Sequence, residues 1–134
     1  MGSKYVRVWL LAASALVIAV LLGACSGGDS DSSKFPIDLT GSRVAAGEEI
    51  YAQNCASYHG PVQGPVVPAA AVHGDAGHTW HHPDRLLHQW VLDRPPLATV
   101  MPAFRGVLSD EQVLEVLAYI KSTWLPEIQE RQDT

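Results

Sequence analysis

The sequence predicts an all-α fold with three main helices and one long loop. Three segments carry apolar residues at spacings of three and four, the period of an amphipathic helix. No run of alternating apolar and polar residues is long enough for a strand. Residues 60–77 are rich in glycine and proline, which favour a loop over a helix or a central strand. A chain of 134 residues has room for one small domain.

The first 24 residues have the pattern of an export signal. Lys4 and Arg7 precede an uncharged apolar run over residues 8–22, which is shorter than the roughly 20 residues that cross a membrane. The run ends in Leu, Gly and Ala before Cys25, a pattern that resembles a bacterial lipobox. We therefore predict a lipoprotein signal peptide over residues 1–24 and lipidation of Cys25; an uncleaved membrane anchor is the alternative. In both cases we expect a tethered domain in the bacterial cell envelope, on a periplasmic or other extracytoplasmic face.

Composition divides the remaining chain into three parts. Residues 25–42 begin with a stretch of Ser, Gly and Asp and are predicted as a flexible tether. Residues 43–126 contain the helical segments and form the predicted domain, and residues 127–134 are predicted as a C-terminal tail. The formal net charge is −5, whereas nucleic-acid-binding domains are typically basic. We therefore expect no nucleic-acid partner.

The first helix is predicted over residues 43–54 and the second over residues 83–93. Pro83 suits the first turn of the second helix, and the Arg-Pro-Pro sequence that starts at Arg94 ends it. The apolar faces of the two helices are formed by Val44, Gly47, Ile50 and Tyr51 in the first, and by Leu86, Leu87, Trp90 and Val91 in the second.

The third helix has the clearest start signal in the chain. Ser109 is placed to cap it, Gln112 lies three residues on as the partner of a capping box, and two acidic residues occupy the positive first turn. Lys121 suits the negative end, and Pro126 prevents a smooth continuation. The predicted core face is formed by Val113, Val116, Leu117, Ile120 and Trp124.

A domain with such a long loop and few large apolar side chains is short of core. We therefore expect another group to fill its middle. Cys55 indicates what that group is. If Cys25 is lipidated, Cys55 has no cysteine left for a disulfide, and in an oxidising compartment we expect it to be bonded to something else.

Cys55 begins the sequence Cys-Ala-Ser-Tyr-His. The attachment pattern for c-type haem is two cysteines separated by two residues and followed directly by histidine, because both thiols bond haem vinyl groups while the imidazole reaches iron. Here Tyr58 stands in place of the second cysteine, and His59 follows it.

The surrounding residues resemble class I cytochromes c from about residue 44 to residue 124. The resemblance rests on Gly47, Tyr51, Gln53, Cys55, His59 and Gly60, then on the Met-Pro-Ala-Phe sequence that starts at Met101, Leu108-Ser109-Asp110-Glu111 and the segment 116–121. It implies a cytochrome c-like fold whose loop wraps haem c and whose first and last helices cross closely at Gly47, against Val116 and Tyr119.

The resemblance also implies the roles of the site residues. Cys55 would form a single thioether to haem c, Tyr58 would fill the place of the second attachment cysteine, and His59 and Met101 would be the axial iron ligands. With both axial positions filled, the iron transfers single electrons and catalyses no reaction of its own. Taken alone, however, Cys55 is also typical of a small buried hydrophobe, His59 of a helix-end histidine and Met101 of core filler.

A histidine-rich stretch around Trp80 has two interpretations; its members are His73, His78, His81, His82 and His88. Its Thr-Trp-His-His-Pro-Asp core resembles a stretch of some small exported cytochromes c. One interpretation is a transition-metal site or a substitute haem ligand. The other is a polar loop that packs Trp80 against the haem edge, which is favoured because adjacent histidines on an irregular loop share no face.

The sequence thus predicts a haem-binding, single-electron carrier in a membrane-tethered respiratory or redox chain. Its expected partners are redox proteins, together with the membrane that holds its lipid anchor. Two alternatives remain open: a haem-deficient, cytochrome-like interaction module, and a metal-binding lipoprotein that uses the histidine-rich loop.

Overall fold

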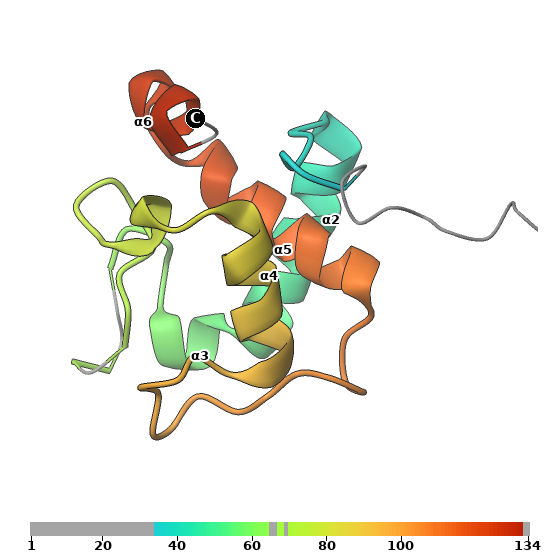
Figure 1. The fold of residues 1–134 in the computed structure, drawn as a ribbon, viewed down its shortest axis with the longest axis vertical. Helices are drawn as coiled ribbons and strands as arrows, with labels where there is room; N and C mark the ends of the chain where they lie inside the picture. The colour runs from blue at the N-terminus through green and yellow to red at the C-terminus, as the bar shows by residue number, and fades with distance from the viewer. Residues whose placement is uncertain (1–33, 65–66, 69, 133–134) are drawn as a thin grey trace, which may run out of the picture. The chain divides into compact units, whose positions relative to one another are not determined.

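The structure is a computed structural model that describes residues 34–64, 67–68 and 70–132. The described elements are α2 (Gly41–Asn54), α3 (Ala56–His59), the 3-10 helix η3 (Thr79–His81), α4 (Asp84–Asp93), α5 (Asp110–Ser122) and α6 (Pro126–Gln132) (Figure 1). Over these ranges the chain contains no strand, only an isolated bridge between Arg105 and Leu108. The all-α prediction is confirmed. The predicted signal peptide, Cys25 and the tether up to residue 33 lie outside the described residues.

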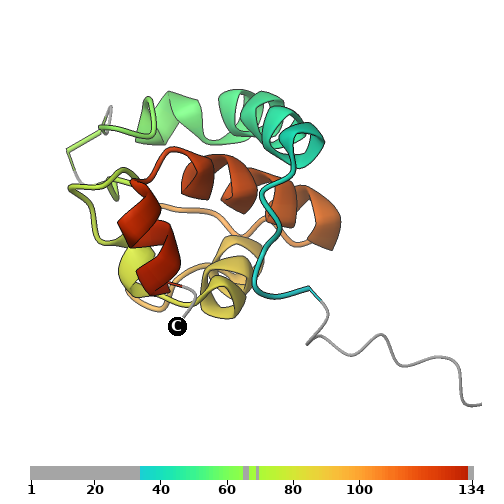
Figure 2. The ribbon, with the colours of Figure 1, turned by 90° about the horizontal axis from the view of Figure 1, so that it is seen from above.

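Helix α5 lies between α2 and α4 (Figure 2). The crossing with α2 is close because Gly47 has no side chain: a Cβ there would overlap the backbone carbonyl of Glu115 and lie 3.0 Å from the Cβ of Tyr119. The predicted contact with Tyr119 is confirmed, whereas the nearest atoms belong to Glu115 rather than to Val116. Glycine is therefore required at this position by backbone contact, which outweighs its low helix propensity.

Helix α2 begins two residues earlier than predicted, because the Thr40 hydroxyl accepts a hydrogen bond from the Arg43 amide and so caps the helix. The residues before it are also packed. Ile37 is only 4% exposed and belongs to the core cluster with Leu87 and Leu117. The prediction of a flexible tether up to residue 42 is therefore wrong for its last part.

Helix α5 starts as predicted. Ser109 accepts from the Gln112 amide while the Gln112 side chain accepts from the Ser109 amide, so both halves of the capping box are present. The helix ends at Ser122, and Trp124 is buried just beyond it. The whole predicted core face is buried: Val113, Val116, Leu117, Ile120 and Trp124.

Helix α4 confirms the second predicted segment to within one residue. Pro83 precedes the first helical residue with extended backbone angles and is the N-cap, one position before the place we predicted. At the other end, Arg94 has a φ of 75°, so the chain leaves the helix in a left-handed conformation before Pro95.

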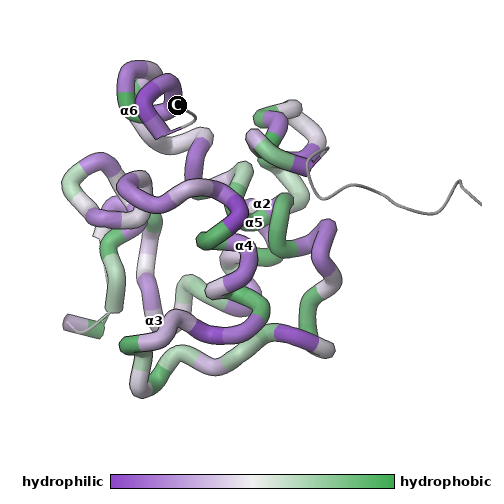
Figure 3. The backbone as a smooth tube through the Cα atoms, in the orientation of Figure 1, coloured by the Kyte–Doolittle hydropathy of each residue, from purple (hydrophilic) through white to green (hydrophobic). Residues whose placement is uncertain are grey.

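The predicted C-terminal tail instead contains helix α6. Pro126 is its first residue, a position where the missing amide hydrogen costs no helical hydrogen bond. Helix α6 is mostly hydrophilic (Figure 3). It is attached through glutamine side chains: the Gln129 amide group donates to the carbonyls of Lys121 and Trp124 at 3.0 and 2.9 Å.

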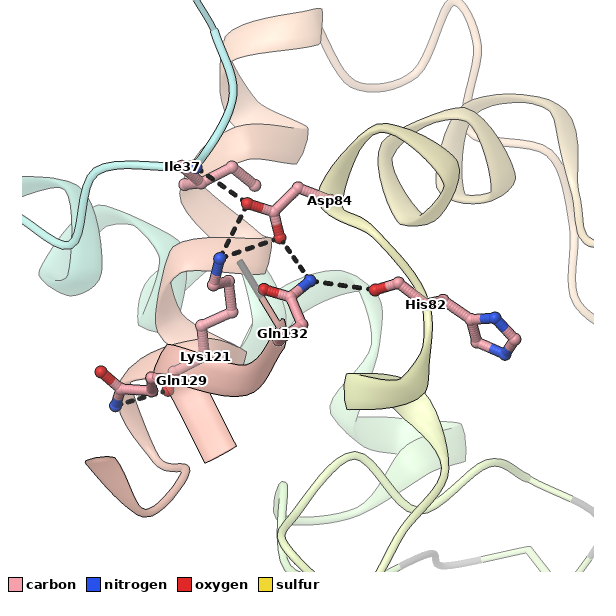
Figure 4. Close-up of polar contacts among 6 residues, drawn as sticks. All are labelled: Ile37, His82, Asp84, Lys121, Gln129 and Gln132. Carbon is pink, nitrogen blue, oxygen red and sulfur yellow. Dashed lines mark hydrogen bonds and ion pairs between the residues drawn. The ribbon is translucent and has the colours of Figure 1, made fainter. Parts of the chain in front are cut away.

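A buried ion pair joins α4, α5 and α6. The Lys121 Nζ lies 2.9 and 2.7 Å from the two carboxylate oxygens of Asp84, and the two side chains are 1% and 5% exposed. The same carboxylate accepts from the Ile37 amide and from Gln132 Nε2, both at 2.8 Å (Figure 4). This network ties the N-terminal lead-in and the C-terminal helix to the middle of the domain.

Among the described residues, no helix is long and apolar enough to cross a membrane.

Candidate functional site

Three cavities share His59 and Met101 in their walls. The first, of about 240 Å³, also borders Cys55 and Tyr58. The second, of about 220 Å³, borders His73, His78, His82 and Trp90. The third, of about 260 Å³, borders Tyr58, Leu97 and Val100. The structure thus brings all four predicted site residues of the domain, Cys55, Tyr58, His59 and Met101, to one connected hollow region.

Cys55 is the residue between α2 and α3, and Tyr58 lies within α3. The Cys55 backbone leaves the regular helix with φ −118° and ψ −39°, and α3 then forms a single short turn. Cys55 is a free thiol, and its burial raises its pKa to about 11. The half-buried Tyr58 ring lies edge-on to His59, with 5.6 Å between ring centroids.

His59 is held by hydrogen bonds at its ring and beside its backbone. The ring Nδ1 lies 3.2 Å from the Ala71 carbonyl. A carbonyl only accepts, so Nδ1 carries the hydrogen and Nε2 keeps its lone pair. The next residue, Gly60, has a φ of 67°, and its carbonyl accepts from the buried Tyr51 hydroxyl at 3.0 Å. This is the arrangement of a metal-ligating imidazole whose other nitrogen is oriented by the backbone.

Met101 lies on the loop between α4 and α5, and that loop is fixed to the end of α4. The Phe104 amide donates to the Val91 carbonyl at 3.1 Å, and the Arg105 amide donates to the Leu92 carbonyl at 2.9 Å. The Arg105 guanidinium adds a two-bond contact to Asp93, at 2.6 and 2.8 Å, which lowers the pKa of that carboxyl. The half-buried Met101 thioether is thereby kept in the wall that it shares with His59.

The residues present fit a haem. The first cavity offers a thiol that can bond a vinyl group, and the region as a whole offers one imidazole nitrogen and one thioether sulfur for the iron. Its remaining walls are largely apolar, as a macrocycle requires; among them are Val91, Val100, Pro102, Phe104, Val116 and Ile120. Tyr58 supplies a ring to this wall and no thiol.

His73 is a second imidazole beside His59, and the sequence did not single out its position there. The two rings lie 4.5 Å apart between centroids. His73 Nδ1 lies 2.8 Å from the Thr79 hydroxyl, which donates to the Val72 carbonyl. Burial, and secondly the neighbouring His59, lower the pKa of His73 to about 3, so it is neutral near pH 7.

Trp124 holds the backbone of this region. Its indole nitrogen donates to the His73 carbonyl at 2.6 Å. The sequence identified Trp124 only as a core residue, because no local pattern reports a hydrogen bond between residues that lie 51 positions apart.

The histidine-rich loop borders the cavities through His73, His78 and His82 rather than through Trp80. Trp80 borders none of the three cavities; it packs against the cluster around Tyr51 and donates to the Asp75 carbonyl at 3.2 Å. Trp90 borders the second cavity instead. Within the ranges that the structure describes, no three His, Cys, Asp or Glu side chains are grouped to hold a metal ion. The metal-binding alternative thus gains no support from this part of the chain.

His78, His81 and His82 form a cluster in which His78 stacks on His81 and meets His82 edge-on. His78 lies 4.5 Å from His81 and 5.0 Å from His82 between ring centroids, and His82 meets Trp90 edge-on at 4.6 Å. Burial, and then the nearby His78 and His81, lower the pKa of His82.

Comparison with known protein families matches residues 42–120, more than half of the chain, to the family described as cytochrome c oxidase, cbb3-type, subunit III. Neither the curated proteins nor the solved structures give a match. The matched domain is a c-type cytochrome domain, which implies covalently bound haem c, an electron-transfer role and an extracytoplasmic location. The chain therefore belongs to the cbb3-type subunit III family of cytochrome c domains and is a class I c-type cytochrome.

Proposed function

We propose that this chain is a single-electron carrier whose haem c is attached through one thioether, at Cys55, and whose iron is ligated by His59 and Met101. The observation that supports this most strongly is that His59 and Met101 border all three cavities together, while the Cys55 thiol borders one of them. A thiol, an imidazole and a thioether in one largely apolar region form the donor set that a class I cytochrome uses.

The chain's residues prepare each ligand. The Ala71 carbonyl keeps the hydrogen of His59 on Nδ1, which leaves Nε2 as the ligating atom and orients the ring. The Met101 sulfur is a soft, neutral ligand that favours ferrous iron and raises the reduction potential. Bound haem supplies the one-electron redox chemistry. With His59 and Met101 both holding the iron, the protein would bind no substrate there.

Tyr58 limits the attachment to one bond. A thioether forms by addition of a thiol to a vinyl group, and a phenol in the same place does not substitute for that reaction. The Tyr58 ring borders two of the cavities, where it can pack against the vinyl group that stays unsaturated. Its aromatic surface therefore replaces a covalent link by van der Waals contact.

Three variants of the full-length chain, produced with cytochrome maturation machinery, test the attachment. Cys55→Ser is expected to abolish haem staining on a denaturing gel. Tyr58→Cys is expected to increase the stained fraction and to create the second thioether. Tyr58→Phe is the matched control, because it keeps the ring and should leave staining unchanged. Staining that survives in Cys55→Ser would contradict the proposal.

We also propose that Cys25 is lipidated and tethers the cytochrome to a membrane of the cell envelope. The lipobox-like sequence supports this. Cys25→Ser should release the chain from the membrane fraction without reducing its haem content. A chain that stays membrane-bound after this change would favour an uncleaved apolar anchor instead.

The family description favours a second candidate, an electron-delivering subunit within an oxidase complex. The two candidates differ in their partners: a carrier meets its redox partners transiently, whereas a subunit migrates with the oxidase. Native gel electrophoresis of solubilised membranes, stained for haem and for oxidase activity, separates them. Comigration would establish the subunit role, and a separate small haem band would support the carrier.

A further inference from the structure

The first and second cavities have chemically different ends. They share His59, His73, Val91 and Met101, so they meet along the same walls. Of the residues that the two cavities do not share, Cys55 borders only the first, and His78 and His82 border only the second. An occupant that fills both must be apolar in the middle, react with a thiol at one end and suit imidazoles at the other.

Unlike most other histidines of the chain, His78 and His82 have ring nitrogens that form no hydrogen bond with a described residue. The sequence contains six histidines, and three of them use a ring nitrogen in a hydrogen bond: His59, His73 and His88. No described residue hydrogen-bonds to the ring nitrogens of His78, His81 or His82. Of these three, His78 and His82 border the second cavity and His81 does not. Two imidazoles thus have N–H groups available at that end.

The backbone of His82 is fixed from the side away from the cavity. Its carbonyl accepts from Gln132 Nε2 at 2.9 Å, and the same amide nitrogen donates to the buried Asp84 carboxylate. The His82 amide donates to the Thr79 carbonyl at 3.2 Å. The imidazole points away from the Asp84–Gln132 contacts (Figure 4) and packs edge-on against Trp90 in the cavity wall. The polar network therefore positions the ring without using its nitrogens.

We propose that His78 and His82 bind the propionate groups of the haem. The inference rests on the proposed function, because it takes haem as the occupant. In the haem macrocycle the vinyl-bearing rings lie opposite the propionate-bearing rings, so attachment at Cys55 directs the carboxylates toward the imidazole end. A carboxylate that is partly removed from water needs hydrogen-bond donors. The third cavity offers the hydroxyls of Tyr58 and Thr99 but no imidazole besides His59.

The histidine-rich loop acquires a role from this arrangement. His78 and His82 donate to the carboxylates, and a protonated imidazole would make such a bond charge-assisted. His81, between them in sequence, borders none of the cavities and stacks on Trp80 and on His78, with 3.7 and 4.5 Å between ring centroids. His81 is the last residue of η3, whereas His82 caps its end and borders the cavity.

The test compares the full-length haem-loaded chain with four variants by resonance Raman spectroscopy of the propionate bending band. His82→Ala and the double variant His78→Ala/His82→Ala should shift the band. They should also lower the reduction midpoint potential, because a less neutralised carboxylate stabilises ferric iron. His82→Gln keeps an N–H donor and should recover part of the band position. His81→Ala is the matched control: it removes an imidazole that borders none of the cavities but stacks on His78, so both quantities should change less than in His82→Ala.

The outcomes separate this inference from the function on which it rests. A chain without covalent haem would overturn both. If haem is attached with unchanged axial ligation in every variant, and the double variant gives the parent band and potential, the propionate assignment alone is wrong. An equal shift in His81→Ala would also overturn it, since that histidine borders none of the cavities. If the double variant folds poorly, the comparison between His82→Ala and His82→Gln decides.

Discussion

Replacing Lys121 by methionine is expected to cause the largest loss of stability of any single change in the ion-pair network. Methionine keeps the length and most of the volume of the side chain but removes the ammonium group. The carboxylate of Asp84, 5% exposed, then keeps two donors at 2.8 Å, the Ile37 amide and Gln132 Nε2. Breaking a buried pair on one side costs about 3–5 kcal/mol. For a domain with a total stability of about 5–15 kcal/mol, that is a large share.

Urea unfolding, followed by far-ultraviolet circular dichroism, measures this loss. Lys34→Met is the matched control, because Lys34 forms an exposed pair with Asp110 at 3.8 Å; it should change the free energy of unfolding by less than about 1 kcal/mol. Adding Asp84→Asn to Lys121→Met removes the uncompensated charge and should recover part of the loss. A loss for Lys121→Met no larger than that for Lys34→Met would refute the reasoning.

Three further predictions concern the helix crossing and the site. Gly47→Ala should lower the free energy of unfolding by about 1–3 kcal/mol, because the new methyl group meets the Glu115 carbonyl; unchanged stability would contradict the close crossing. Met101→Ala should leave haem attached but let cyanide bind iron, and an absorption spectrum that cyanide leaves unchanged would argue against Met101 as ligand. In haem-free chain, alkylation of Cys55 monitored by mass spectrometry should accelerate about tenfold per pH unit up to about pH 11, because the raised pKa keeps the thiol protonated at lower pH. A rate that levels off near about pH 8 would show an unperturbed thiol.

The elements that the sequence predicts well are those with local signals. The capping box at Ser109 and Gln112 sets the start of α5, and the apolar spacing identifies its core face. The predicted start of α2 is two residues late because apolar spacing alone does not mark Thr40 as a cap. Helix α6 was missed for a related reason: Pro126 ends one helix, but the same residue is suited to begin the next.

The elements that the sequence does not reveal depend on contacts between distant residues. The Asp84–Lys121 pair joins residues 37 positions apart, and the bond from Gln132 to the His82 carbonyl spans 50. Periodicity within a helix carries no information about such pairs. They arise only when α4, α5 and α6 are packed together.

The candidate site shows the same division. Cys55, Tyr58 and His59 are adjacent in sequence, so their joint role was readable from a motif. Met101 reaches them only because the loop before α5 is fixed to the end of α4. His82 borders a cavity and His81 does not, and this difference depends on the turn of η3. The amino-acid composition of the loop does not predict that turn.

The central claim is that haem is bound covalently through Cys55 alone, and the alkaline pyridine haemochrome spectrum of the unmodified full-length chain tests it most directly. A single thioether leaves one vinyl group conjugated with the macrocycle. The account therefore predicts covalent haem whose α band lies at longer wavelength than that of haem c with two thioethers. Haem that is fully extracted into acidified solvent, or an α band at the two-thioether position, would contradict it.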